Sequence, residues 1–322
     1  METVKLSTGA KMPLLGLGTW LSKPGEVEKA VEEAIKEGYR LIDTAWVYGN
    51  EKEIGKAIEK CVNDGIIKRE ELFVTTKVWT SYMHREDVTI SLKQSLDRLG
   101  LSYVDLLLVH MPCAMKKASD KPHDVNEKGM PIFDDVDHLD TWKGMEDVFN
   151  SGLSKAIGVS NFNQRQIQRI CDNAAVKPHN QQVELHAYWP QFEMTEFCQS
   201  RGITVTAYSP LGSPGRIEFF KSRNMPYSTS TPDQLKDSTV LGIATAHKKT
   251  AAQVLLRWLM QLDISVIPKS VNPARIRENF GVFDFKLSPF EMESMNGLKT
   301  RERLFDQKFL MGHPEDPFKQ DR

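Results

Sequence analysis

The sequence lacks a surplus of either charge. Its 322 residues include 42 lysines and arginines against 43 aspartates and glutamates, which gives a formal net charge of −1. A chain with this balance has no strong field to attract the phosphates of a nucleic acid or the surface of an anionic membrane. We therefore expect neither a nucleic acid nor a membrane among its partners.

Long apolar runs and paired cysteines are also missing. No window approaches the roughly 18 consecutive apolar residues of a membrane-spanning helix, and the N-terminal M-E-T-V-K-L-S-T lacks the apolar core of a secretory signal. The cysteines show no C-x-x-C pairing and lie at Cys61, Cys113, Cys171 and Cys198. Together these features favour a cytoplasmic protein with reduced thiols over a disulfide or zinc framework.

Motifs of several enzyme classes are absent. The histidines have neither H-E-x-x-H nor cysteine-ligand spacing, so we expect no metal, and without a G-x-S-x-G motif a serine-based triad lacks support. The stretch G-L-G-L-G-T-W contains Gly16 and Gly18, but Leu21 stands where a dinucleotide fingerprint needs a third glycine. A short buried strand with close backbone packing explains this stretch better than a Rossmann fold does.

The chain contains a repeated alternation of short apolar strands and amphipathic helices. After a hairpin over residues 3–14, we expect a strand at Gly16–Gly18 and further strands at residues 40–43, 72–78, 104–109, 155–159, 180–185, 203–207 and 264–267. Helices are predicted at residues 26–37, 51–62, 86–99, 139–149, 164–172, 191–200 and 246–261, with a last one from Pro273. This order predicts an α/β protein with a (β/α)8 TIM barrel, and a doubly wound open sheet is the alternative. Two long loops, at residues 113–138 and 209–238, interrupt the repeat.

In a (β/α)8 barrel the active site lies at the C-terminal ends of the strands. Polar and aromatic residues recur at the predicted ends: Trp20, Asp43, Tyr48, Lys77, Trp79, His110, Ser160, Asn161, Gln182, Glu184, Tyr208, Ser209, Lys269 and Ser270. We therefore take this end of the barrel as the candidate site.

Four of these residues suggest proton transfer. Lys77 ends an apolar strand, where it needs a partner such as the Asp43 carboxylate on the neighbouring strand. A structural ion pair would explain these two residues alone. Tyr48, five residues after Asp43, could act as a general acid if the Lys77 ammonium lowers its pKa, which is about 10 in a free tyrosine. His110, at the end of the fourth strand, could donate a hydrogen bond to a substrate oxygen.

The stretch V-I-P-K-S-V-N-P-A-R-I-R-E-N-F predicts an anion site. Asn272 and Pro273 are a good N-cap and first helical position, with basic and hydroxyl side chains close by at Lys269, Ser270, Arg275 and Arg277. Backbone donors at a helix N-terminus, together with guanidinium groups, bind phosphate well. Basic residues on a solvated helix face are the alternative.

The whole chain resembles the aldo-keto reductase family, and within it the aldose and aldehyde reductase branch. The resemblance rests most on G-Y-R-L-I-D-T-A-W-V-Y-G-N-E, T-K-V-W and P-K-S-V-N-P-A-R-I-R-E-N-F, with K-A-I-G-V-S-N-F and T-A-Y-S-P-L-G-S between them. It implies a catalytic tetrad of Asp43, Tyr48, Lys77 and His110, and an NADPH molecule extended across the barrel mouth. Ser160, Asn161 and Gln182 would bind the carboxamide, and Tyr208 would stack on the nicotinamide. The remaining implied cofactor contacts are Thr19, Trp20, Asp43, Ser209, Leu211, Ser213, Lys269, Ser270, Val271, Arg275, Glu278 and Asn279.

The resemblance implies NADPH-dependent reduction of aldehydes and ketones to alcohols by a monomeric enzyme with one domain over residues 1–322. The carbonyl substrate would meet Trp20, Tyr48, Trp79, His110 and Met111, beside a C-terminal tail at residues 298–322. Met111 departs from the tryptophan of close relatives, and the tail does not match that of aldose reductase. A Schiff-base aldolase that uses Lys77, and a cofactor-binding regulatory or structural protein without turnover, are the alternatives.

Overall fold

Eight short parallel strands form the centre of the fold. The computed structural model describes residues 1–23, 25–118, 121–222 and 232–319. The strands follow one another around the sheet in chain order. Their bounds are Leu17–Gly18 (β3), Leu41–Asp43 (β4), Phe73–Val78 (β5), Leu106–Val109 (β6), Ile157–Ser160 (β7), Asn180–Glu184 (β8), Thr204–Tyr208 (β9) and Ile264–Val266 (β10).

The first and last strands meet, so the sheet closes. Leu15 bridges to Val266 and Gly18 to Lys269, both in parallel orientation, and the Gly16 amide donates to the Val266 carbonyl at 2.9 Å. A Cβ atom on Gly18 would lie 2.6 Å from the Ile267 carbonyl oxygen, so only glycine permits this approach. The predicted (β/α)8 barrel is confirmed, as is the close-packed strand, and the open sheet is excluded.

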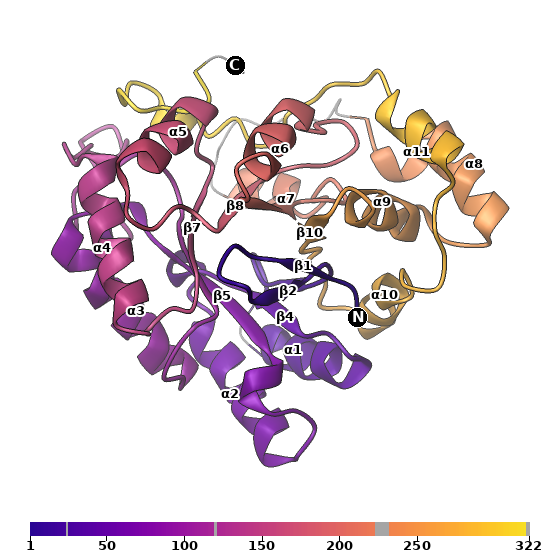
Figure 1. Ribbon diagram of the computed structural model, residues 1–322, viewed down its shortest axis with the longest axis horizontal. Helices are drawn as coiled ribbons and strands as arrows, with labels where there is room; N and C mark the ends of the chain where they lie inside the picture. Colours follow the sequence, from indigo (N-terminus) through magenta and orange to yellow (C-terminus); the bar gives the residue numbers. More distant parts are fainter. Residues whose placement is uncertain (24, 119–120, 223–231, 320–322) are drawn as a thin grey trace.

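Helices on the outside cover the strands (Figure 1). The first helix shows why: Val27, Ala30, Val31, Ala34 and Ile35 form one buried stripe, and the helix ends at Gly38 with a φ of 113°. The predicted helices are present as Glu26–Glu37 (α1), Glu51–Asn63 (α2), Arg85–Leu99 (α3), His138–Asn150 (α4), Gln164–Asn173 (α5), Phe192–Gln199 (α6), Ala251–Met260 (α9) and Pro273–Phe280 (α10). Within the described ranges every helix is too short or too polar to cross a bilayer.

The chain between β9 and α9 differs from the prediction. The helix expected over 246–261 begins later than predicted, because Lys248 has a φ of 56° and Thr250 caps a new helix, α9. The preceding residues form a separate helix, Ser238–His247 (α8), and the expected loop holds a short helix, Arg216–Ser222 (α7). Residues 223–231 of that loop, and 119–120 of the first, lie outside the described residues. A further unexpected helix, Pro289–Asn296 (α11), precedes the tail.

The predicted hairpin is present and pairs β1 (Thr3–Lys5) with β2 (Lys11–Pro13). It lies in front of the strands in the view of Figure 1. Its side chains Leu6 and Met12 are buried among apolar residues of the strands, including Leu41, Phe73 and Leu106. The hairpin therefore covers the N-terminal ends of the strands.

Candidate active site

The four residues of the predicted tetrad meet at the C-terminal ends of the strands. Lys77 lies one residue before the end of β5, and its Nζ donates to Asp43 Oδ1 at 2.6 Å and to the Thr44 carbonyl oxygen at 2.9 Å. The same ammonium lies 3.5 Å from the Tyr48 hydroxyl. The Tyr48 ring makes an edge contact with His110, with 5.7 Å between centroids. Strand β4 brings Asp43 to this point, and a short 3-10 helix, Trp46–Tyr48, brings the tyrosine.

The cluster is buried and its charges compensate one another. The Lys77 and Asp43 side chains are 0% and 4% exposed. Desolvation lowers the pKa of Lys77, while Asp43 opposes that shift. Burial also lowers the pKa of His110 well below its usual value, and the Lys77 charge adds to the effect. At neutral pH His110 is therefore a neutral imidazole.

The expected lowering of the Tyr48 pKa is wrong. Desolvation of the phenol raises the pKa well above its usual value, and the Asp43 charge acts in the same direction. Lys77 does not reverse this, because Asp43 lies nearer to the ammonium than the Tyr48 oxygen does. Tyr48 is therefore a neutral phenol with a proton to give.

Trp79 and His110 line one side of the tetrad. Their rings make an edge contact with 5.1 Å between centroids, and both side chains are buried. The Trp79 Nε1 and His110 Nδ1 atoms are buried without a hydrogen-bond partner in the described structure. Buried polar atoms without partners are costly in a closed core but suit a site that receives a polar ligand.

Four polar side chains adjoin Asp43, and we call them the amide ledge: Ser160, Asn161, Gln182 and Tyr208. Gln182 Nε2 donates to Asp43 Oδ2 at 2.8 Å. Asn161 Nδ2 donates to the Ser160 hydroxyl at 3.1 Å, and its Oδ1 accepts from the Tyr208 hydroxyl at 2.9 Å. The structure thus brings together the four residues expected around the nicotinamide end of a cofactor.

Backbone strain marks the same end of the barrel. Asn161, Ser209 and Ser213 have φ values of 63°, 55° and 44°, a region that residues other than glycine seldom adopt. Leu211 is partly buried between the two serines. The buried Arg216, the first residue of α7, donates from its Nη1 to the Gly212 carbonyl oxygen of this loop at 2.7 Å. The sequence prediction missed this arginine, although a charged residue after S-P-L-G-S was a signal for it.

Lys269 and Arg275, two of the cations of the predicted anion site, lie near each other. Partial desolvation lowers the pKa of Lys269; the Glu26 charge opposes this shift, and the charges of Lys23 and Arg275 add to it. However, the Asn272 side chain accepts from the amides of Ala274 and Arg275, so the helix N-terminus is capped from within.

The other residues of this region divide between the site and the scaffold. Arg277 does not join the cations, because it pairs with Glu33 of α1. Glu278 accepts from Thr250 at 3.0 Å. Ser270 and Asn279 are buried, and Val271 is partly buried. The cationic surface is therefore formed by side chains, chiefly Lys269 and Arg275, with Lys23 as a member that the sequence prediction missed.

The C-terminal tail packs against Trp20 and Trp79. Phe305 lies edge-on to Trp20 at 5.5 Å between centroids, and Phe219 of α7 lies at 5.2 Å on the same indole. On the other side, the tail residues Leu310 and Phe318 share a buried cluster with Trp79, Met111, Cys113 and Met115. The tail contributes Phe305, Leu310 and Phe318 to the surroundings of the site, and no periodic pattern in the sequence indicated them.

Thr19 lies at the tetrad, since its hydroxyl donates to the Asp43 carbonyl oxygen at 2.9 Å. No group of three or more His, Cys, Asp or Glu side chains in the described ranges has an arrangement that could hold a metal ion. The closed barrel and the buried ionisable cluster at one end define the class as a (β/α)8-barrel enzyme.

The chain belongs to the aldo/keto reductase family, whose sequence profile matches residues 14–300. It is 43% identical over 330 residues to aldo-keto reductase family 1 member A1 of Mus musculus, covering 98% of each chain. The Gallus gallus protein of the same name is 44% identical over 327 residues, covering 98% of this chain and 97% of the relative. A solved structure described as the aldose reductase from Schistosoma japonicum superimposes with a TM-score of 0.91 at 44% identity, covering 100% of both chains. These relatives identify the protein as an oxidoreductase.

Proposed function

We propose that the protein reduces aldehydes and ketones to alcohols with NADPH and that Tyr48 donates the proton. One observation supports this most: a neutral phenol lies 3.5 Å from a buried ammonium that Asp43 holds in place. An acid works only in its protonated form, and burial keeps Tyr48 in that form.

The side chains divide the work of the proton transfer. Tyr48 gives its proton to the carbonyl oxygen as negative charge develops there. Lys77 then stabilises the phenolate, since a cation nearby favours the charged form of a tyrosine. Asp43 orients Lys77 through the 2.6 Å contact. Neutral His110 donates a hydrogen bond that orients the carbonyl.

The residues present fit a nicotinamide cofactor. The amides of Asn161 and Gln182 provide donors and acceptors of the kind that a carboxamide needs, and the Tyr208 ring adjoins them. A bound nicotinamide cofactor supplies the hydride. At the other end, the charges of Lys269 and Arg275 favour NADPH over NADH, because a 2′-phosphate offers them an anion. The strained Ser209–Ser213 loop would cover the pyrophosphate.

Two rival functions have less support. A Schiff-base aldolase needs Lys77 as a neutral nucleophile, but that ammonium is 0% exposed and paired with Asp43. Borohydride trapping in the presence of a carbonyl substrate would label Lys77 only if an imine forms. A cofactor-binding protein without turnover would have no need for a connected proton donor, ammonium and carboxylate.

For the substrate class, we propose hydrophobic and aromatic aldehydes. Trp79 and Met111 are buried in one apolar cluster that the tail completes. Burial of apolar area contributes roughly 25 cal/mol per Å², whereas sugar hydroxyls lose water without enough partners in such a pocket. Residues 298–322 would act as a substrate-pocket tail of a single domain over 1–322, although 320–322 lie outside the described residues. All these side chains come from one chain, which suits a monomer.

The test is NADPH oxidation, followed by absorbance, with a nitro-substituted benzaldehyde, glucose and xylose under one set of conditions. After correction for the small open-chain fraction of the sugars, the aromatic aldehyde should have a much higher kcat/KM. Sugar efficiency equal to the aromatic value would refute the proposed substrate class. A lack of NADPH oxidation with every carbonyl compound would refute the reductase itself.

A further inference from the structure

Glu184 is a buried carboxylate at the end of β8 that the proton transfer does not use. Its side chain is 0% exposed. Both of its oxygens accept hydrogen bonds from main-chain amides of the C-terminal tail: Oε1 from Leu304 at 2.5 Å and Oε2 from Phe305 at 3.1 Å. A carboxylate can leave water only if such donors or cations replace its hydration. The tail therefore completes the environment of Glu184, and Glu184 in turn fixes the tail.

Cationic and donor groups complete this environment. His186 Nε2 lies 3.0 Å from Oε1 and donates to it, since a carboxylate only accepts. Arg303, also in the tail, brings its Nη1 within 3.9 Å of Oε2. The buried Arg216 of α7 lies within electrostatic range of the same carboxylate. Glu184 thus joins strand β8 to the tail.

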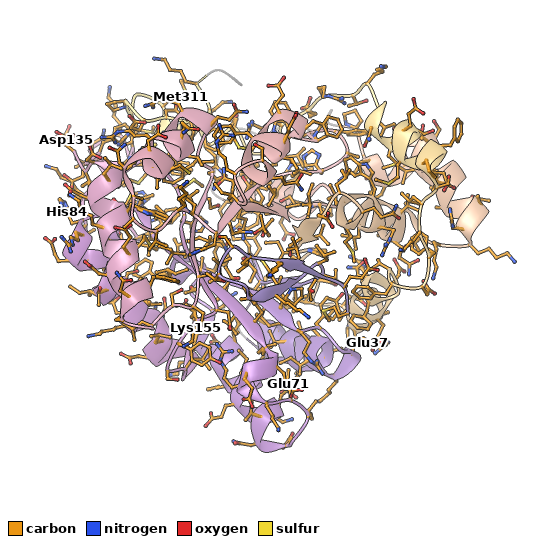
Figure 2. The ribbon with its side chains drawn as sticks, viewed as in Figure 1. Glu37, Glu71, His84, Asp135, Lys155 and Met311 are labelled. Carbon is orange, nitrogen blue, oxygen red and sulfur yellow. The ribbon has the colours of Figure 1, made fainter. Side chains whose placement is uncertain are left out.

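This anchor has a direct consequence for the pocket. Phe305, whose amide Glu184 holds, is 7% exposed, and its ring makes edge contacts with Trp20 at 5.5 Å and Tyr208 at 5.8 Å between centroids. Farther along the tail, neighbouring side chains differ in burial: Met311, at the periphery in Figure 2, is 54% exposed, while Leu310 is buried. The Glu184 contact holds the Phe305 main chain, and the contacts with Trp20 and Tyr208 then place the ring.

We propose that Glu184 is a positioning residue that seats Phe305 over Trp20 and Tyr208 and thereby sets the affinity for the carbonyl substrate. The inference rests on the proposed function for its kinetic part. Glu184 touches neither the tetrad nor the reacting oxygen, so its loss changes binding and leaves the proton transfer intact.

Glu184→Gln is the informative variant, because it keeps the size of the side chain. It leaves one oxygen as acceptor, so one of the two tail amides, Leu304 or Phe305, loses its acceptor. Asp105→Asn is the matched control. Asp105 likewise accepts from a main-chain amide, Val74 at 2.9 Å, and pairs with an arginine, Arg69 at 2.8 Å. It precedes β6, at the opposite end of the barrel from the tail.

Hydrogen exchange tests the anchor without any need for activity. The Leu304 and Phe305 amides should be protected in the natural protein, and at least one of them should exchange at least about tenfold faster in Glu184→Gln, as expected for the loss of a charge-assisted hydrogen bond. Asp105→Asn should leave their exchange unchanged. Unchanged exchange in Glu184→Gln would overturn the proposal, whatever the enzyme turns over.

Kinetics test the consequence. Glu184→Gln should raise KM for an aromatic aldehyde about tenfold and keep kcat within about twofold. In a Phe305→Ala background, the same substitution should have little further effect, because the two residues act through one contact. A fall in kcat at constant KM, or additive effects in the double variant, would assign Glu184 a purely structural role and overturn the proposal. Failure of the natural protein to reduce any aldehyde would instead refute the proposed function, and the exchange result would still decide the anchor.

Discussion

The two ends of the barrel are built from the same eight strands but differ in the side chains that they bury. At the N-terminal end, Leu41, Phe73 and Leu106 pack against Leu6 and Met12 of the hairpin. At the C-terminal end, the same strands finish in a buried ion pair, a ledge of amides and residues with positive φ. One end is a closed apolar core, and the other keeps polar groups in geometries that cost stability.

This contrast teaches where each kind of substitution should act. The hairpin end stabilises the protein through apolar burial, so changes there should alter the free energy of unfolding and leave the reaction untouched. At the C-terminal ends of the strands, buried charged and polar side chains cost stability and serve the proposed reaction, so changes there should alter turnover. Each of the following predictions tests that division, from the largest expected effect to the smallest.

Lys77→Met should have the largest effect, because it leaves Asp43 buried without its cation. Breaking one partner of a buried pair costs about 3–5 kcal/mol of stability, and turnover should be lost as well. Chemical denaturation and NADPH oxidation measure the two effects. A fully active Lys77→Met protein would contradict the assignment of Lys77 to the site.

Leu6→Ala tests the opposite end. A large-to-small change in a packed core costs about 2–5 kcal/mol, and Leu6 is 1% exposed. The midpoint of urea unfolding should fall, while kcat/KM of the folded variant should match that of the natural protein. A specific loss of kcat would show that the hairpin communicates with the site.

Arg275→Met should reduce the preference for NADPH over NADH. A charge-assisted hydrogen bond contributes about 1.5–3 kcal/mol, or about 10- to 150-fold in affinity. Fluorescence titration with both cofactors measures the ratio. Arg277→Met is a matched control, because Arg277 pairs with Glu33 and should not contact the phosphate. Equal affinity of the natural protein for NADPH and NADH would contradict this prediction.

The pH dependence should be the smallest effect. Burial and the Lys77 charge lower the pKa of His110, so the imidazole is neutral at any pH above that lowered pKa. Burial raises the pKa of Tyr48, so the phenol stays protonated at any pH below that raised pKa. Neither group then changes charge between about pH 6 and pH 8, and kcat/KM for aldehyde reduction should stay flat there. A step near the ordinary histidine pKa of about 6.5 would show that His110 titrates normally.

Much of the fold and of the candidate site could be predicted from the sequence, and the reasons are physical. Asp43 and Lys77 end apolar strands, and parallel strands bring their ends together, so the ion pair follows from the fold. The boundary before α9 was also readable, since Thr250 and Gln253 form a capping box, but the apolar residues before it suggested one continuous helix. Tyr48 lay where expected, yet the direction of its pKa shift depended on burial, which spacing does not reveal.

The tail could not be predicted in the same way. Phe305 and Leu310 lie in a segment without helical or strand periodicity, and their positions depend on contacts with distant residues such as Glu184 and Trp79. Arg277 and Glu33 likewise pair across 244 positions of sequence. Local pattern identifies which strand ends carry chemistry, whereas the shape of the pocket depends on long-range packing.

The most direct test of the account is Tyr48→Phe, measured for both turnover and NADPH binding. Removing the phenolic hydroxyl should lower the rate of aldehyde reduction by about 100- to 10,000-fold. The affinity for NADPH should stay near that of the natural protein, because the cationic surface and the amide ledge are unchanged. Turnover that persists in a correctly folded Tyr48→Phe protein would contradict the assignment of the proton donor.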